Sequence, residues 1–149
     1  MELKLIRVKH QGESIDGILK VDGERLCDTA ENLITSLIPG TYQIIRVFCK
    51  QYQRFVPKIM LPQETETSLR HLCATCPKQK GVSNNTTLKC VCHQLKMGNG
   101  IHHRDDGSIL LGTTIIPGCL KKTREPYENL SERIRKVSGR GNEITLTIY

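Results

Sequence analysis

Four cysteines in the middle of the chain have the spacing of two paired metal-binding knuckles. Two residues separate Cys73 from Cys76, and Cys90 and Cys92 follow after a gap of 13 residues, with one residue between them. Zinc takes four soft ligands in a tetrahedron, and two short pairs joined by one loop supply them at little ordering cost. We therefore predict a zinc site formed by Cys73, Cys76, Cys90 and Cys92, with His93 as an alternative to Cys92.

Two other states of these thiols stay open. One is a set of free thiols, which a reducing compartment favours. The other is a pair of disulfides that link one knuckle to the other, because a disulfide within Cys-x-Cys is strained. The isolated cysteines Cys27, Cys49 and Cys119 are expected to be buried and to act as small apolar side chains.

The cysteines lie within a basic stretch that contains no acidic residue. Residues 68–104 carry six lysines and arginines and four of the five histidines, in a chain whose net charge is +7. Such a stretch is either a solvated basic loop or a site for an anionic ligand or nucleic acid. Because the chain has no Trp and only 4% aromatic residues, it lacks the stacking platform typical of single-strand binders. The predicted binding residues are Asn99, His102, His103 and Arg104.

The elements that must position these residues are mainly β. Residues 3–8 alternate apolar and charged side chains, which predicts a strand. Residues 17–21 and 24–27 flank Asp22-Gly23, a strong signal for a hairpin because a type I′ turn needs positive φ at both central residues. The β-branched and aromatic residues of 41–48 follow a Pro-Gly turn and predict a further strand.

The second half of the chain predicts shorter strands and one helix. Residues 55–61 form a strand whose Pro57 suits a sheet edge or a bulge, and residues 108–111 form a short buried strand. A helix is expected over residues 124–137 with Thr123 as its N-cap. A final strand follows, in which Ile144, Leu146 and Ile148 alternate with threonines. The apolar residues on the buried face of the helix are expected to be Tyr127, Leu130, Ile134 and Val137.

These elements predict one domain over residues 1–149, with a Cys-rich insertion at about residues 62–94. Its fold class is mainly β (α+β), a twisted sheet or partly closed β-barrel with one late helix packed on it. The first residues do not form a signal peptide, and no apolar run approaches the roughly 20 residues that a membrane-spanning helix needs. We therefore expect a cytoplasmic protein without membrane insertion.

Short motifs occur in a fixed order along the chain outside residues 62–94. They are Gly17-Ile18-Leu19-Lys20-Val21-Asp22-Gly23-Glu24, Ile38-Pro39-Gly40-Thr41-Tyr42, Arg54-Phe55-Val56-Pro57, Gly98-Asn99, Gly107-Ser108-Ile109-Leu110-Leu111-Gly112 and Tyr127-Glu128-Asn129-Leu130. This order resembles a family of small bacterial and prophage proteins known only as a domain of unknown function. That family is itself similar to the catalytic domain of L,D-transpeptidases. The resemblance implies a β-rich fold and a cysteine nucleophile that attacks peptidoglycan stem peptides.

The chain departs from this pattern at both positions that would carry the chemistry. The family cysteine falls on Ser108 and the family histidine on Lys96. A thiolate beside a histidine is nucleophilic near neutral pH, whereas a serine hydroxyl needs an aligned base. The resemblance therefore implies that the chemistry is lost, unless His102 serves as a base for Ser108 or Cys119 is the nucleophile.

Three functions follow from these observations. The favoured one is a non-catalytic binding or structural module of unknown ligand, encoded by a phage or mobile element. The first alternative is a degenerate or serine-based L,D-transpeptidase-like enzyme acting on peptidoglycan through Ser108 or Cys119. The second alternative is a zinc-supported nucleic-acid-binding protein, which rests on the cysteine knuckles and the basic stretch.

Overall fold

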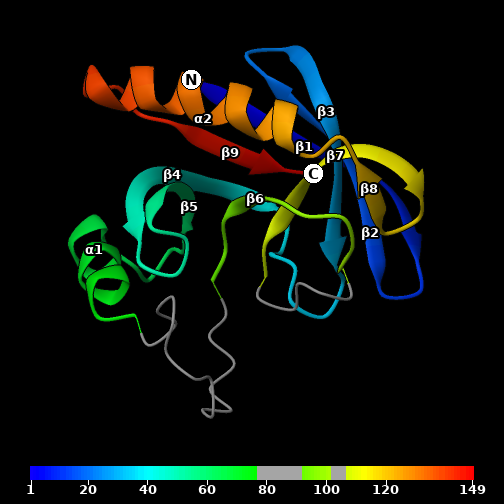
Figure 1. The fold of residues 1–149 in the computed structure, drawn as a ribbon, viewed down its shortest axis with the longest axis horizontal. Coiled ribbons are helices and arrows are strands. Elements are labelled where there is room, and N and C mark those ends of the chain that lie inside the picture. Colours follow the sequence, from blue (N-terminus) through cyan, green and yellow to red (C-terminus); the bar gives the residue numbers. More distant parts are fainter. Residues whose placement is uncertain (77–91, 102–106) are drawn as a thin grey trace.

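The computed structural model describes residues 1–76, 92–101 and 107–149, and it is mainly β as predicted (Figure 1). A single curled sheet contains all nine strands of the described chain, and two helices pack against it. The strands are β1 (Glu2–Gln11), β2 (Ser14–Val21), β3 (Glu24–Asn32), β4 (Gly40–Cys49), β5 (Arg54–Met60), β6 (Leu95–Met97), β7 (Ile109–Ile116), β8 (Cys119–Lys121) and β9 (Thr145–Ile148). The helices are α1 (Glu66–Ala74) and α2 (Arg124–Gly139).

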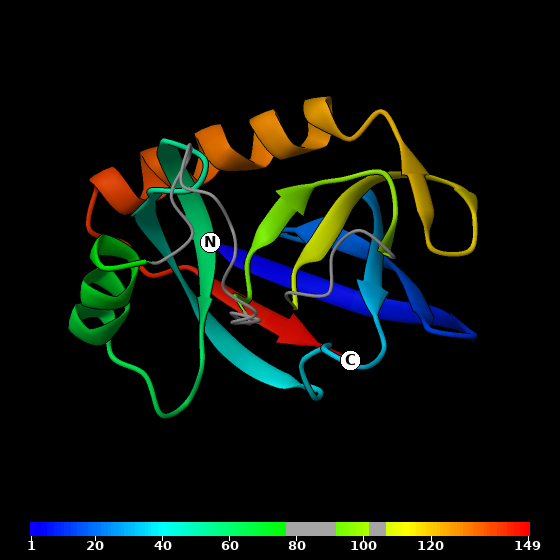
Figure 2. The ribbon, with the colours of Figure 1, turned by 60° about the horizontal axis from the view of Figure 1, so that its bottom comes forward.

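The sheet curls until its two ends approach each other. Its strand order is β5-β4-β9-β1-β2-β3-β7-β6, with β8 paired to β7. At the seam between β5 and β6, the Ile59 amide donates to the His93 carbonyl at 3.0 Å, and Lys58 and Gln94 form an isolated bridge. The prediction of a partly closed barrel is confirmed (Figure 2).

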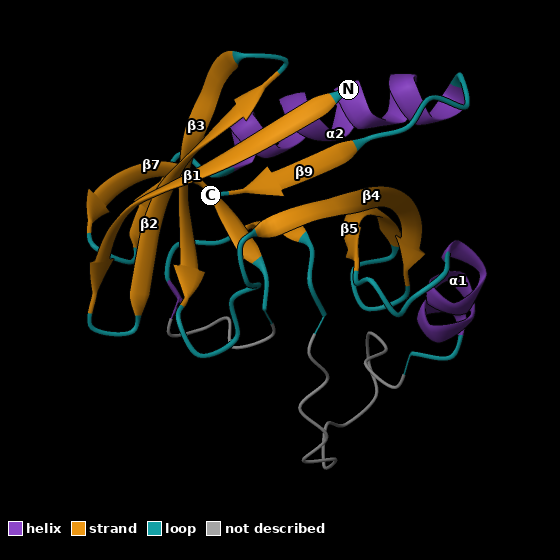
Figure 3. Ribbon diagram, turned by 180° about the vertical axis from the view of Figure 1, so that it is seen from behind, coloured by secondary structure: helices purple, strands orange, loops and turns teal. Residues whose placement is uncertain are grey.

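The strand β9 joins the two halves of the sheet. It runs parallel to β1 on one side and antiparallel to β4 on the other. Leu146 and Ile148 of β9, and Ile144 directly before it, are buried in the main core, as the pattern predicted. The strands β1 and β9, the first and last strands along the described chain, therefore lie side by side near the middle of the sheet (Figure 3).

The hairpin between β2 and β3 turns at the predicted residues. Asp22 has φ 49° and Gly23 has φ 90°, so both central residues take the positive φ that a type I′ turn requires. The strand β5 ends the strand order, which gives Pro57 the edge position that its missing N–H suits.

The helix α2 matches the predicted helix and packs along one side of the curled sheet (Figure 2). Tyr127, Leu130 and Ile134 are buried in the main core, and Val137 packs against it half-buried. The prediction for Thr123 is only half right. Thr123 occupies the N-cap position, but its φ and ψ are those of a right-handed helix and its side chain makes no capping hydrogen bond.

The helix α1 was not predicted, because it lies where the apolar pattern breaks down. A capping box starts it: the Thr65 side chain accepts from the Ser68 amide, and the Ser68 hydroxyl accepts from the Thr65 amide. Only Leu69 and Cys73 of this helix are buried. Within the described residues, neither helix is long and apolar enough to cross a bilayer.

Candidate functional site

Two of the predicted zinc ligands converge on a buried lysine rather than on each other. Cys73 is on the buried face of α1, and Cys92 lies just before β6. The ammonium of Lys58, a residue only 6% exposed, donates to the Cys73 sulfur at 3.6 Å, and the Cys92 sulfur lies close enough to raise the pKa of Lys58. The side-chain amide of Gln94 donates to the Cys92 sulfur at 3.1 Å. We call Lys58, Cys73, Cys92 and Gln94 the thiol–lysine cluster.

Burial and nearby charges shift the pKa values of this cluster in opposite directions. Burial raises the pKa of the Cys73 thiol, and the nearby Lys58 ammonium only partly offsets it. Burial alone would lower the pKa of Lys58, but the Cys92 and Cys73 sulfurs outweigh it and raise that pKa. Lys58 therefore keeps its positive charge inside the protein, with sulfur atoms as its polar partners.

The described residues do not complete a zinc site. Cys76 lies just past α1, where its amide donates to the Cys73 carbonyl at 3.4 Å, and Cys90 lies outside the described residues. His93, the alternative ligand, already engages Nδ1 with the Gly107 carbonyl at 3.0 Å. Among residues 1–76, 92–101 and 107–149, no three His, Cys, Asp or Glu side chains are grouped to hold a metal. The zinc site stays a prediction.

The two positions singled out by the family resemblance lie on neighbouring parallel strands. Lys96 is in β6, and Ser108 directly precedes β7. Ser108 is only 3% exposed, and its hydroxyl donates to the Cys92 carbonyl at 3.4 Å. The Lys96 ammonium is also buried, and it sits over the Tyr52 ring at 5.1 Å from the centroid. Both side chains therefore point into protein surroundings.

The other predicted site residues are spread along the β6–β8 side of the fold. Asn99 is exposed, and its carbonyl accepts from the Leu120 amide at 2.8 Å. Cys119 is the first residue of β8 and is half-buried, and it forms an isolated β-bridge with Gly100. The remaining predicted binding residues, and the proposed base His102, lie outside the described part of the chain; they are His102, His103 and Arg104.

In a small pocket next to the thiol–lysine cluster, two cationic side chains lie over aromatic rings. The Arg54 guanidinium lies 5.1 Å from the Tyr127 ring centroid and 5.6 Å from that of Tyr52, which Lys96 also faces. The pocket has a volume of about 80 Å³. Gln94 contributes a buried Oε1 atom that has no hydrogen-bond partner among the described residues. We call this the basic pocket; its lining is Tyr52, Arg54, Val56, Gln94, Lys96, Met97 and Tyr127.

The basic pocket was missed because its residues are far apart in the sequence. Tyr52, Arg54 and Val56 alternate along β5 and its approach, and Gln94 and Lys96 alternate across the start of β6. In a strand this period of two places side chains on one face, and this was the available signal. These two faces come together only because the sheet curls.

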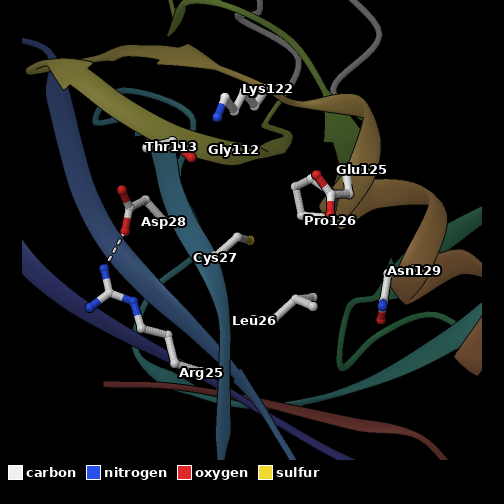
Figure 4. Close-up of a pocket in the computed structure, with 10 residues that line it drawn as sticks. All are labelled: Arg25, Leu26, Cys27, Asp28, Gly112, Thr113, Lys122, Glu125, Pro126 and Asn129. Atoms are coloured by element: carbon white, nitrogen blue, oxygen red, sulfur yellow. Dashed lines mark hydrogen bonds and ion pairs between the residues drawn. The ribbon is translucent and has the colours of Figure 1, made fainter.

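A larger cavity of about 390 Å³ opens between β3, β7 and the first turn of α2 (Figure 4). Its charged groups have both signs, and Arg25 and Asp28 already form an ion pair with each other. Asp28 also accepts from the Thr114 amide at 2.8 Å. The lining comprises Arg25, Leu26, Cys27, Asp28, Gly112, Thr113, Lys122, Glu125, Pro126 and Asn129.

The thiol of Cys27, which lines this cavity, stays protonated at neutral pH. Burial raises the pKa of Cys27 to about 12, against a smaller opposing contribution from the Gly112 backbone. A thiol must lose its proton to act as a nucleophile or as a metal ligand. Cys27 is therefore a buried, protonated thiol that acts as a small apolar side chain, as predicted.

Comparison of the chain with protein-family models, with curated proteins and with solved structures found no match. The resemblance to the uncharacterised domain family, and through it to L,D-transpeptidases, thus stays a prediction that rests on motif order.

Proposed function

We propose that this protein is a non-catalytic binding module that holds an anionic group of its ligand in the basic pocket. The observation that carries this proposal is the pair of cations, Arg54 and Lys96, that face the same Tyr52 ring beside one recess. Aromatic faces attract cations without neutralising them. Arg54 forms no ion pair with a carboxylate in the described part of the chain, so its charge is available to a ligand.

The dimensions of the pocket indicate which group it takes. A volume of about 80 Å³ suits one carboxylate or phosphate group, since a whole drug-sized ligand needs roughly 300 Å³ or more. The buried Gln94 Oε1 lacks a donor within the described residues, and such an atom costs free energy until one reaches it. A ligand group that brings both negative charge and an N–H or O–H donor fits these residues.

The surroundings of Ser108 and Lys96 support binding rather than acyl transfer. A serine nucleophile must reach the substrate from an accessible position, whereas Ser108 is buried with its hydroxyl directed at a backbone carbonyl. At the position where the resemblance implies a histidine, this chain has Lys96, whose side-chain nitrogen faces the Tyr52 ring. The same two positions thus favour holding an anion over activating a nucleophile.

Calorimetric titration with inorganic phosphate and with acetate at low ionic strength tests the proposal. We expect saturable binding of at least one anion, weakened by about tenfold or more in Arg54→Met, because a charged hydrogen bond contributes about 1.5–3 kcal/mol. Arg46→Met is the matched control, since Arg46 also stacks on an aromatic ring, that of Phe55, outside the pocket. Absence of saturable binding, or equal affinities in the two variants, would refute the proposal.

The two alternatives keep their own tests. An enzyme acting on peptidoglycan would release stem peptides from purified cell wall, and its activity should fall in Ser108→Ala or Cys119→Ala. A nucleic-acid-binding protein that neutralises about five phosphates would lose affinity with salt at a log–log slope near −4.5. A single anion pocket predicts no peptide release and a much shallower salt dependence.

A further inference from the structure

Asn99 and Gly100 form the only Asn-Gly pair in the sequence, and they lie just after the end of β6. The Asn99 side chain is exposed and forms no hydrogen bond with the described residues. Because glycine has no Cβ atom, nothing on Gly100 shields its backbone nitrogen from the side chain of the preceding residue. The backbone nitrogen of Gly100 can therefore approach the side-chain amide carbon of Asn99.

The bridge between this pair and β8 uses the backbone groups on either side of the Gly100 nitrogen. The Leu120 amide donates to the Asn99 carbonyl at 2.8 Å, and the Ile101 amide donates to the Gly118 carbonyl at 3.2 Å. The Gly100 amide itself donates to no backbone carbonyl in the part of the chain that the structure describes. Its N–H is therefore not engaged, while the residues before and after it are held.

We propose that Asn99 is a self-modifying site, at which the Gly100 nitrogen attacks the Asn99 side chain and converts it slowly to isoaspartate. The reaction needs no enzyme, and its only co-reactant is water. Asparagine is among the thermally labile residues of proteins, and here its amide has no partner to hold it. This inference concerns the contact between β6 and β8 and does not depend on the basic pocket.

The reaction balances in two steps. In the first, the Gly100 nitrogen loses its proton and attacks the Asn99 Cγ atom; the new N–Cγ bond closes a cyclic imide, and the side-chain nitrogen leaves as ammonia with that proton. In the second, water adds to the former backbone carbonyl of Asn99 and breaks its bond to the Gly100 nitrogen. That carbonyl becomes a free carboxylate, and the main chain now runs through Cβ and Cγ. No atom is oxidised or reduced.

The conversion changes the backbone at the contact with β8. The carbonyl that accepts from the Leu120 amide becomes a free carboxylate, and Gly100 and Ile101 are attached one carbon further along. Ile101 is only 1% exposed and packs in a small buried cluster with Leu120. Close-packed side chains tolerate such a displacement poorly. The segment therefore loosens from β8, and a negative charge appears in the stretch 68–104, which has no acidic residue of its own.

The test incubates the full chain at pH 8 and 37 °C and follows the tryptic peptide 97–104 by mass spectrometry. We expect its mass to rise by about 1 Da as the amide becomes a carboxylate, and a protein isoaspartyl methyltransferase to label it. The peptides 125–133 and 141–149 contain Asn129 and Asn142 and are internal controls. Both should keep their mass, because a leucine and a glutamate follow these asparagines and their side chains hinder the attack.

Two variants separate the chemistry from its consequence. In Gly100→Ala the new Cβ atom meets nothing closer than 3.7 Å, so the fold should be kept, while the methyl group should slow the conversion at least about tenfold. Asn99→Asp carries the same new charge on an unaltered backbone and should keep the urea midpoint of the wild type. The isoaspartate form, separated by ion exchange, should unfold at a lower urea concentration.

Three results would overturn the proposal. The first is that Asn99 keeps its amide in the folded chain while a synthetic peptide 97–104 loses its own. The second is that Gly100→Ala converts at the wild-type rate. The third is that the isoaspartate form and Asn99→Asp unfold at the same urea concentration, since the contact with β8 would then survive the longer backbone.

Discussion

The guanidinium of Arg7 and the carboxylate of Glu31 form a two-pronged ion pair inside the protein. Their hydrogen bonds measure 3.0 Å from Nε to Oε2 and 2.8 Å from Nη2 to Oε1. The side chains are only 9% and 2% exposed, and Nη2 also donates to the Leu37 carbonyl at 2.6 Å. Because Arg7 is in β1 and Glu31 in β3, the pair reaches across the intervening β2.

Removing one member of this pair should destabilise the fold strongly. Arg7→Met leaves the Glu31 carboxylate buried without its counter-charge, and we expect a loss of about 3–5 kcal/mol in the free energy of unfolding. Urea denaturation measures the change. The exposed pair of Arg135 with Glu132 is the control, and Arg135→Met should leave the denaturation midpoint nearly unchanged. Equal midpoints for the two variants would contradict the prediction.

Gly17 should not tolerate a side chain. A Cβ atom there would lie 2.8 Å from the Ile6 carbonyl oxygen and 2.8 Å from the Thr29 hydroxyl oxygen. Gly17→Ala is therefore expected to cost about 1–3 kcal/mol in thermal or urea unfolding. At Gly139, in the last turn of α2, a Cβ meets nothing within 4 Å, so Gly139→Ala should stabilise by up to about 1 kcal/mol. Similar effects at the two sites would show that the close approach at Gly17 relaxes freely.

Asp28 should contribute to acid sensitivity. Burial alone would raise its pKa, but the Thr114 amide and the Arg25 guanidinium outweigh burial and lower the pKa below 3.8. A lowered folded-state pKa adds stability above about pH 4, and this contribution is lost as pH falls through the folded value. Urea midpoints from pH 7 to pH 2.5 should therefore fall less steeply below pH 4 for Asp28→Asn than for the wild type. Parallel curves would rule this contribution out.

Cys27 should resist alkylation in the folded protein. With a pKa of about 12 instead of 9.0, its thiolate fraction at pH 8 is about a thousandfold below that of an ordinary thiol. Iodoacetamide treatment at pH 8, followed by peptide mass spectrometry, should leave Cys27 unmodified in buffer and alkylated in urea. Rapid labelling under native conditions would mean that the segment around Cys27 opens readily.

Local signals in the sequence were enough for most of the fold. Asp22-Gly23 predicted the hairpin because these two residues alone determine the type of turn. The spacing of Tyr127, Leu130 and Ile134 predicted the helix in which they are buried. The strands β6 and β8 were missed because each has only three residues, too few for a period to register. The helix α1 has a Thr65–Ser68 capping box but only two buried residues, so its apolar pattern was too sparse to predict it.

The sites were harder to predict than the elements. The knuckle spacing predicted a zinc site that includes Cys73 and Cys92, and this stays a prediction. Nothing local in the sequence indicates that the Lys58 ammonium donates to the Cys73 sulfur. Arg54 and Lys96 line the same pocket because the curl of the sheet brings β5 close to β6. Contacts made by curvature depend on the twist and stagger of every strand between, which no short motif encodes.

The place of β9 has a consequence for biosynthesis. The hairpins β1–β2–β3 and β4–β5 can each pair as soon as they are translated, yet β9, which lies between β4 and β1, is the last of the described strands to be made. Until residues 145–148 leave the ribosome, the facing edges of β1 and β4 stay open to pairing with other chains. In a nascent chain, these two edges are therefore where we expect pairing with a neighbouring chain on the same polysome.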